Sequence, residues 1–154
     1  MKALIQRVKK VSLSVKEREA RFIGQVSQGL LVFIGVEESD SLDDLDFLVD
    51  KIVNLRIFED DQGKMNLSIK DKNFEIMCIP NFTLAASVRK GRRPSFDKAA
   101  VPQKGREFFD LFCSKIKEAG LSSVEGVFGA EMIIEAVSYG PVNIILDSNI
   151  RRQC

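Results

Sequence analysis

The sequence lacks histidine and tryptophan altogether, and it holds one tyrosine and three cysteines among its 154 residues. The missing histidine excludes a Ser-His-Asp triad, a Cys-His pair and any zinc site with a histidine ligand. If the protein is an enzyme, its proton transfers must therefore come from carboxylates, lysines, Tyr139, the backbone, water or the substrate itself.

The three cysteines are far apart in the sequence and form no Cys-x-x-Cys pattern, so we expect no metal site and no redox motif. Cys78 and Cys113 lie in apolar segments, which predicts buried thiols and a reducing compartment. No signal peptide is recognisable, and the longest apolar run, residues 30–36, is too short to cross a bilayer. We therefore expect a cytoplasmic protein with no membrane partner and no cofactor.

Length and composition fit one globular domain spanning residues 1–154, with a flexible tail at 149–154. Hydrophobic residues make up 45% of the chain and charged residues 29%. The 23 basic and 22 acidic side chains give a net charge of +1, which excludes a uniformly polybasic protein but leaves room for a local basic patch.

Hydrophobic periodicity predicts two helices among many short strands. A helix capped by Ser39–Ser41 is expected to end near residue 55, and a second helix is expected at 103–119. Strands are predicted at 3–15, 21–26, 29–36, on both sides of a turn at 60–63, at 74–86 with a break at Pro80, and at 130–139 and 142–148. This order favours an α/β (α+β-like) fold in which a mixed, largely antiparallel sheet curls into a partial barrel with two outer helices.

Two charged segments have competing interpretations. Residues 59–61 are consecutive acids before a glycine, which is typical of a solvated turn, with a metal site as the alternative. Residues 89–93 hold four cations in five positions, which fits either a solvated loop or a loop that binds phosphates of RNA or of a nucleotide. In a chain so close to neutral, such a patch would bind an end or a stem of RNA.

The strand break at Pro80 is a candidate for chemistry. Thr83 has no histidine to activate it as a nucleophile, so a hydrogen bond to the backbone is the simpler role. Backbone N–H groups of Asn81, Phe82 and Thr83 can instead form an oxyanion hole. Residues 140–141 form a Gly-Pro turn between two predicted strands, and X-Pro bonds can be cis or trans.

Seven stretches of the sequence, in their order and spacing, resemble the D-aminoacyl-tRNA deacylase (D-Tyr-tRNA deacylase) family. They are IQRV (5–8), GLLVFIGVEE (29–38), KIVNLRIFEDDQGKMNLS (51–68), NFTLAA (81–86), KGRRPSF (90–96), FGAEM (128–132) and GPVNIILDS (140–148). Each stretch is weak by itself, but together they cover nearly the whole chain. The resemblance implies the deacylase fold and a homodimer with active sites at the subunit interface.

The same resemblance implies an activity and its partner, the 3′ end of aminoacyl-tRNA. Members of the family hydrolyse the ester between a D-amino acid and the terminal adenosine of tRNA, and they also remove mischarged glycine. This is chiral proofreading in translation and involves no DNA.

The resemblance also implies roles for individual residues. Gly140 and Pro141 match a cis Gly-Pro pair that reaches into the partner's active site and leaves no room for an L side chain. Arg7 matches a residue that helps to hold this pair, and Asn81 lies among the substrate-binding residues. Rejection of the L form would then be steric, by backbone atoms.

For catalysis, the resemblance implies that amides of Phe82 and Thr83 bind the carbonyl oxygen while the 2′-hydroxyl of the terminal ribose takes part in proton transfer. An alternative makes Thr83 the nucleophile. Phe128 and Met132 would lie beside the terminal adenosine, and Arg92 and Arg93 beside the acceptor end.

The sequence departs from the family pattern at three positions in or next to this site. Pro80 stands where serine is usual, Asn81 replaces glutamine, and Asn143 stands where threonine usually follows Gly-Pro-Val. These changes leave two alternatives open, namely a related deacylase with relaxed chirality and a non-catalytic tRNA-binding module on the same fold.

Overall fold

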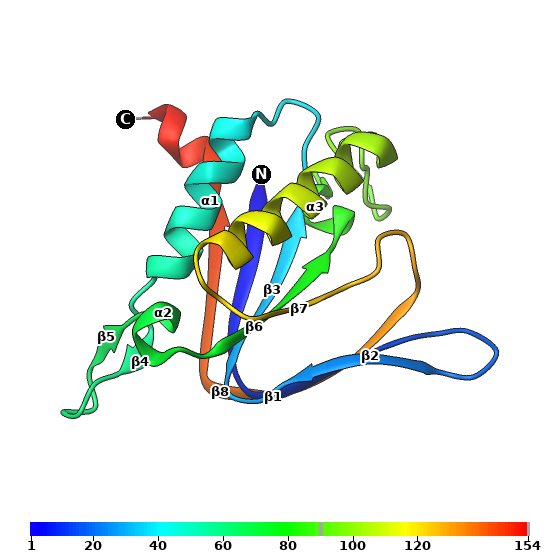
Figure 1. The fold of residues 1–154 in the computed structure, drawn as a ribbon. Helices are drawn as coiled ribbons and strands as arrows, with labels where there is room; N and C mark the ends of the chain where they lie inside the picture. Colours follow the sequence, from blue (N-terminus) through cyan, green and yellow to red (C-terminus); the bar gives the residue numbers. More distant parts are fainter. Residues whose placement is uncertain (90, 154) are drawn as a thin grey trace.

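A six-stranded sheet forms the centre of the protein, of which the computed structural model describes residues 1–89 and 91–153 (Figure 1). The strands follow the order β2-β1-β3-β6-β7, and β8 pairs with the other edge of β1. Their bounds are β1 (Lys2–Val15), β2 (Arg21–Val26), β3 (Gly29–Gly35), β6 (Glu75–Pro80), β7 (Ser123–Glu125) and β8 (Met132–Asp147).

The pairing is antiparallel between β1 and each of β2, β3 and β8, and parallel for β3 with β6 and for β6 with β7. The predicted mixed, largely antiparallel sheet is therefore confirmed. The apolar segment 29–36 forms β3, which lies between β1 and β6 and is buried at nearly every position, as its lack of alternation predicts.

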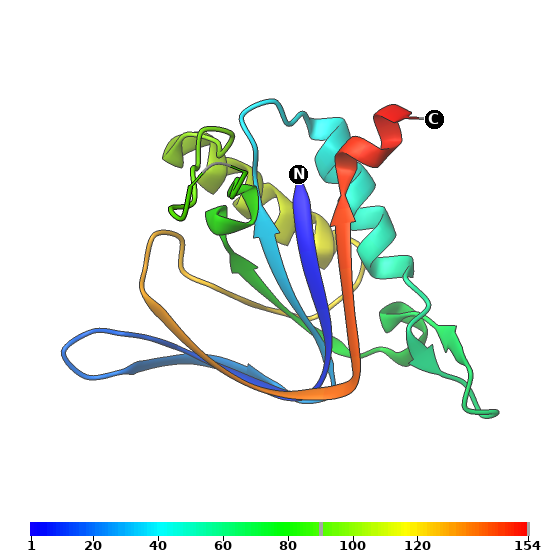
Figure 2. The same ribbon diagram turned by 180° about the vertical axis from the view of Figure 1, so that it is seen from behind.

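Two long strands curl the sheet. β1 and β8 both bend sharply at the lower edge of the molecule, so that β2 and the adjoining halves of β1 and β8 turn away from the other strands (Figures 1 and 2). The β1–β8 register shifts on both sides of Val8, which is the signature of a bulge, and bulges bend strands. Because of the bend, the two halves of β1 pack in different apolar clusters.

Helices α1 (Leu42–Asn54) and α3 (Pro102–Glu118) cover one face of the sheet (Figures 1 and 2). The predicted capping of α1 is present, because the Ser41 N–H and hydroxyl both donate to Asp44 Oδ2, at 2.9 and 2.8 Å. Both helices contribute to the larger core cluster, in which Leu48, Phe112 and Cys113 are buried. The second cluster fills the inside of the curl.

Several local predictions were wrong. Residues 82–85 were expected to continue a strand but form a 3-10 helix, η1 (Phe82–Ala85). The two strands predicted at 130–139 and 142–148 are one strand, β8, and the Gly-Pro pair is a bulge within it. The remaining short elements are β4 (Phe58–Glu59), β5 (Met65–Leu67) and the unpredicted helix α2 (Ile69–Lys72).

The C-terminal segment, expected to be a flexible tail from residue 149, forms a 3-10 helix, η2 (Ser148–Gln153). Its first residue, Ser148, is fully buried and accepts a hydrogen bond from the α-amino group of Met1 at 2.6 Å. Cys154 lies outside the described residues. Within the described ranges, no helix has the length and apolar character needed to cross a membrane.

Candidate active site in two parts

The Gly140–Pro141 pair lies at the bend of β8, where this strand bulges against β1. Asn143 pairs with Gln6 and Ser138 with Val8, so the residues between them stand opposite Arg7. The Gly140–Pro141 bond is cis, as the resemblance implies, and both residues are exposed. The bulge thus presents the Gly-Pro backbone at the surface.

The buried Arg7 side chain holds this bulge. Its Nε donates to the Tyr139 carbonyl at 3.1 Å, and its Nη1 donates to the Ile57 carbonyl at 2.7 Å. The guanidinium also lies over the Tyr139 ring, 4.6 Å from the centroid, and 3.8 Å from Glu59 Oε1. One side chain therefore ties the residue before Gly140 to the β4 segment.

Glycine is required at position 140 for two reasons. Its φ of +125° lies where L side chains are strained. A Cβ atom would also lie 2.9 Å from the Val142 nitrogen and 3.0 Å from Arg7 Nη2. Residue 140 therefore has no side chain, and atoms of Val142 and Arg7 occupy the space that one would need.

In the acidic turn next to this region, the Asp60 carboxylate accepts hydrogen bonds from residues of the same turn. Asp60 Oδ1 accepts from the N–H groups of Gln62 and Lys64 at 2.9 and 3.0 Å, and Oδ2 accepts from Asn66 at 3.2 Å. These bonds, that from Lys64 foremost, lower the pKa of Asp60 from its ordinary value. The carboxylate therefore acts as the cap of the turn.

The other predicted catalytic residues follow the end of β6. Pro80 pairs with Ile34 of β3 but lacks an N–H group, and the next N–H, of Asn81, donates to the Ile34 carbonyl at 2.7 Å. The chain then turns into η1, with Asn81 as its N-cap residue. The strand break at Pro80 is thus confirmed, and a short helix follows it.

The Asn81 side chain binds Thr83 twice. Asn81 Oδ1 accepts from the Thr83 N–H at 3.1 Å and also from the Thr83 hydroxyl. An amide oxygen is not a base, so this contact positions the Thr83 hydroxyl without activating it. The Phe82 N–H has no hydrogen-bond partner among the described residues, and it is the amide left available at the start of η1.

Aromatic residues and a shallow hollow flank η1. The exposed Phe82 ring packs edge-on against Phe96, with 5.0 Å between centroids. On one side, Phe82 and Met132 line a hollow of about 330 Å³. On the other, the Phe82 and Phe128 side chains line a narrow crevice, and the Arg106 guanidinium lies 4.9 Å from the Phe128 centroid. Phe82 therefore lines one hollow with Met132 and another with Phe128.

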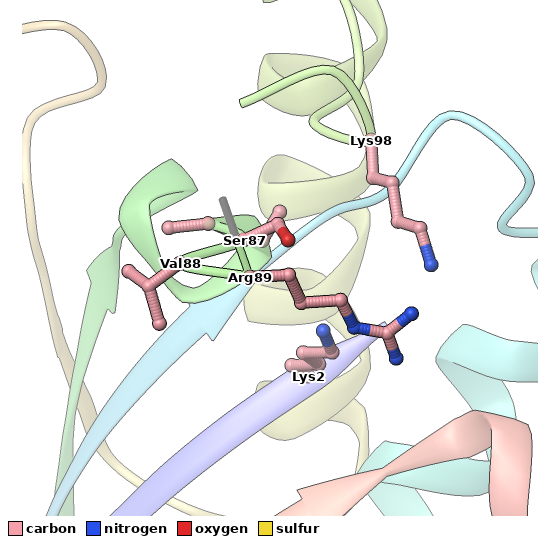
Figure 3. Close-up of a pocket in the computed structure, with 7 residues that line it drawn as sticks. Lys2, Ser87, Val88, Arg89 and Lys98 are labelled. Carbon is pink, nitrogen blue, oxygen red and sulfur yellow. The ribbon is translucent and has the colours of Figure 1, made fainter. Parts of the chain in front are cut away.

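The structure describes three of the four cations in the predicted basic segment 89–93. Arg92 and Arg93 are exposed in the loop between η1 and α3, and Lys90 lies outside the described residues. Arg89 instead lines a hollow with Lys2 and Lys98 (Figure 3). Sequence reasoning did not select Lys2, which is far from the basic segment in sequence, or Lys98, which lies beyond its end.

The buried cysteines are confirmed as core thiols. The pKa of Cys78 is raised well above its ordinary value by its hydrogen bond with Cys113 and by burial. A thiol held protonated in this way is a poor nucleophile.

Within one chain, the Gly-Pro bulge and η1 lie far apart. Arg7 pairs with Leu30 and Pro80 with Ile34, so the two groups are separated by four residues along β3, or roughly 13 Å. β1 and β3 also lie between β8 and β6, which adds roughly 14 Å across the sheet. Figures 1 and 2 show the bend of β8 at the edge where β3 begins, opposite the end from which η1 follows β6.

The structure thus combines a curled sheet with a cis Gly-Pro bulge at one end and, at the other, the η1 turn, where the Phe82 amide has no partner among the described residues. A sequence model of the D-Tyr-tRNA(Tyr) deacylase family matches residues 4–147, and the chain belongs to this family. It is 47% identical over 148 residues to the D-aminoacyl-tRNA deacylase of Aquifex aeolicus (strain VF5), covering 96% of this chain and 98% of that one. It is 49% identical over 150 residues to the D-aminoacyl-tRNA deacylase of Natranaerobius thermophilus (strain ATCC BAA-1301), covering 97% and 98%.

Solved structures agree with the fold. A c-Myc DNA unwinding element binding protein superposes with a TM-score of 0.88 at 35% identity, over 96% of this chain and 98% of that one. A probable eukaryotic D-amino acid tRNA deacylase superposes with a TM-score of 0.83 at 17% identity, over 95% and 98%, and at that identity it supports the fold alone.

Proposed function

We propose that the protein hydrolyses the ester that joins a D-amino acid to the 3′-terminal adenosine of tRNA, the reaction for which its family is named. The observation that carries this assignment is the exposed Gly140–Pro141 backbone, held from behind by buried Arg7. A surface made of backbone atoms rejects a side chain of the wrong hand by steric exclusion. Removal of glycine from mischarged tRNA belongs to the same proposal, because glycine has no side chain to exclude.

Catalysis in this proposal rests on position and on a backbone donor. The Phe82 N–H, which has no partner in the part of the chain that the structure describes, binds the ester carbonyl oxygen as negative charge develops on it. One such donor contributes about 2.7–4 kcal/mol. Thr83 is a structural residue whose hydroxyl binds Asn81, and the 2′-hydroxyl of the substrate ribose serves in proton transfer. No step needs a metal or a histidine.

Two copies of the chain complete the site. The Gly-Pro bulge and η1 are too far apart in one chain to contact one substrate carbon, so we propose a homodimer in which each copy's bulge enters the other's η1 site. The outward side of β8 supports an interface, since Ile133, Val137 and Ile145 are 46%, 55% and 77% exposed there. A two-fold arrangement of one such surface is the commonest way to close a dimer.

The remaining assignments concern the residues that contact the RNA. Phe128 and Met132 hold the terminal adenosine by stacking and apolar contact, while Arg92 and Arg93 lie toward the acceptor end. As a translation-proofreading enzyme, the protein acts in the cytoplasm as one domain spanning residues 1–154.

The direct test compares D-Tyr-tRNA with L-Tyr-tRNA in the presence of EDTA. Rapid loss of the D ester with retention of the L ester is expected. Loss of both esters at similar rates would indicate relaxed chirality, and tRNA binding without turnover would indicate a non-catalytic module. Duplex DNA as a competitor tests whether binding is specific for tRNA.

Subunit mixing tests the dimer. Variants Gly140→Ala and Asn81→Ala are each expected to lose activity, but their mixed dimer contains one site with both parts intact. Activity that returns on mixing supports a bulge supplied by the partner. No recovery after verified subunit exchange would mean that each chain forms its site alone.

A further inference from the structure

Three cations line one hollow of about 280 Å³ beside η1. Lys2 comes from the start of β1, and Arg89 and Lys98 come from the loop between η1 and α3. In the view of Figure 3, the Arg89 guanidinium lies between the ammonium groups of Lys98 and Lys2. Neither the fold nor the proposed hydrolysis at Phe82 requires this convergence.

The positive charge of the hollow is only partly balanced. Lys2 Nζ pairs with the buried Glu37 carboxylate at 3.0 Å, and an ammonium group has further N–H donors to offer. Arg89 and Lys98 are exposed, and neither has an ion pair or a hydrogen bond from its side chain to any described residue. Like charges gathered around one hollow repel one another, and an anion bound between them relieves that repulsion.

The chemistry and the place of the hollow favour a phosphate group. A guanidinium and two ammonium groups offer several charged donors to the oxygens of one phosphate, which arginine can bind through two parallel hydrogen bonds. Ala85 and Ala86, which also line the hollow, follow Phe82 by three and four residues. A nucleic acid whose terminal ester lies at Phe82 therefore carries its own phosphates close to this hollow.

We propose that Lys2, Arg89 and Lys98 form a phosphate site that holds the backbone of the tRNA acceptor strand. The proposal rests on the proposed function for the identity of the RNA, and it adds a site outside the hydrolytic centre. Its role is to anchor the strand so that the terminal ester reaches the Phe82 amide. Such contacts carry no sequence information and fix register and orientation.

The test uses the double variant Arg89→Ala/Lys98→Ala, with Arg18→Ala/Lys64→Ala as a control of equal charge change. All four residues are exposed, and the control pair lies outside the hollow. For D-Tyr-tRNA hydrolysis, we expect the KM of the double variant Arg89→Ala/Lys98→Ala, called the hollow variant below, to rise roughly fivefold with kcat unchanged. This is the result expected for a contact that is made equally in the ground state and the transition state. The slope of log K against log salt for binding of uncharged tRNA should fall by about 0.7–0.9, as for one lost phosphate contact.

A substrate without phosphates separates this proposal from the deacylase assignment. D-Tyr esterified to adenosine should be hydrolysed equally by wild type, hollow variant and control. If the wild type hydrolyses neither ester, the proposed function fails, and the salt slope for uncharged tRNA still tests the hollow.

Two outcomes would overturn the phosphate site for tRNA. One is a KM and a salt slope in the hollow variant equal to those of the control variant. The other is that, at constant ionic strength, inorganic phosphate binds to the wild type and not to the hollow variant, while both proteins bind tRNA with equal affinity. The hollow would then be a site for free phosphate instead.

Discussion

The two parts of the candidate site are fixed in different ways. At the β8 bulge, the buried side chain of Arg7 reaches across strands to the carbonyls of Tyr139 and Ile57. At the start of η1, Asn81 binds a residue only two positions further along the chain. The bulge is thus held by tertiary structure, and the η1 turn is held by its own local sequence.

This difference fits the two roles proposed for these parts of the site. A steric filter works only if its atoms do not yield, and a buried, multiply bonded arginine gives the bulge that rigidity. An amide that stabilises developing charge must instead be open to the substrate, and the Phe82 N–H has no hydrogen-bond partner within residues 1–89 and 91–153. The following predictions test the contrast, from the largest expected effect to the smallest.

Arg7→Ala should reduce the free energy of unfolding by about 3 kcal/mol, because it leaves buried carbonyl groups without donors. Urea denaturation measures this loss. Arg7→Lys keeps the charge but cannot make both hydrogen bonds, and it should recover only part of the stability. The control Arg21→Ala, which breaks an exposed ion pair with Glu17, should change stability by less than about 1 kcal/mol. Equal losses for the two alanine variants would contradict a bulge held by Arg7.

Gly140→Ala should cost about 1–3 kcal/mol of stability and should strongly reduce hydrolysis of the D ester, since Cβ meets Val142 and Arg7. Gly63→Ala is the matched control, because Gly63 also has a positive φ, of +74°, but nothing lies within 4 Å of its Cβ. The control should lose about 1 kcal/mol and keep full activity. An active Gly140→Ala enzyme would remove the bulge from the site.

Asn81→Ala should reduce stability by about 1 kcal/mol, as for other lost N-caps, and kcat by roughly tenfold or more, because the η1 amides lose their position. Ser68→Ala, which removes the cap of α2, should cause a similar loss of stability without a loss of kcat. If both variants keep wild-type kcat, the Asn81 contact is purely structural.

Thr83→Ala should keep kcat within about threefold of the wild type, because its hydroxyl donates to an amide oxygen and has no base to activate it. Steady-state hydrolysis of D-Tyr-tRNA measures this. Complete loss of activity in a folded variant would make Thr83 the nucleophile.

The smallest effect concerns the acidic turn near the bulge. Hydrogen bonds, that from Lys64 foremost, lower the pKa of Asp60 below its ordinary value of 3.8. A lowered pKa means that the carboxylate stabilises the fold above pH 3.8 and that this contribution is lost as the pH falls through the lower folded value. Asp60→Asn should therefore weaken the pH dependence of the urea midpoint in acid, and an unchanged dependence would contradict this role.

Local patterns predicted much of the fold. The alternation of β1, the apolar run of β3 and the apolar faces of α1 and α3 each correspond to the observed element within a few residues. The strand break at Pro80 was also predictable, since proline lacks the N–H that a central strand needs. Residues 82–85 were not predicted correctly, because the Asn81 cap and the packing of Leu84 on Gly35 favour a helical turn over a strand.

By itself, the sequence determined that no histidine of this chain takes part in catalysis, and it predicted most of the strands and both long helices. Only the tertiary structure decided that the Gly-Pro pair is a bulge within one strand, that Arg7 holds it, and that it lies far from η1 in the same chain. The same holds for the convergence of Lys2, Arg89 and Lys98. The physical reason is that these features depend on strand register and bending, which bring together residues that no local pattern links.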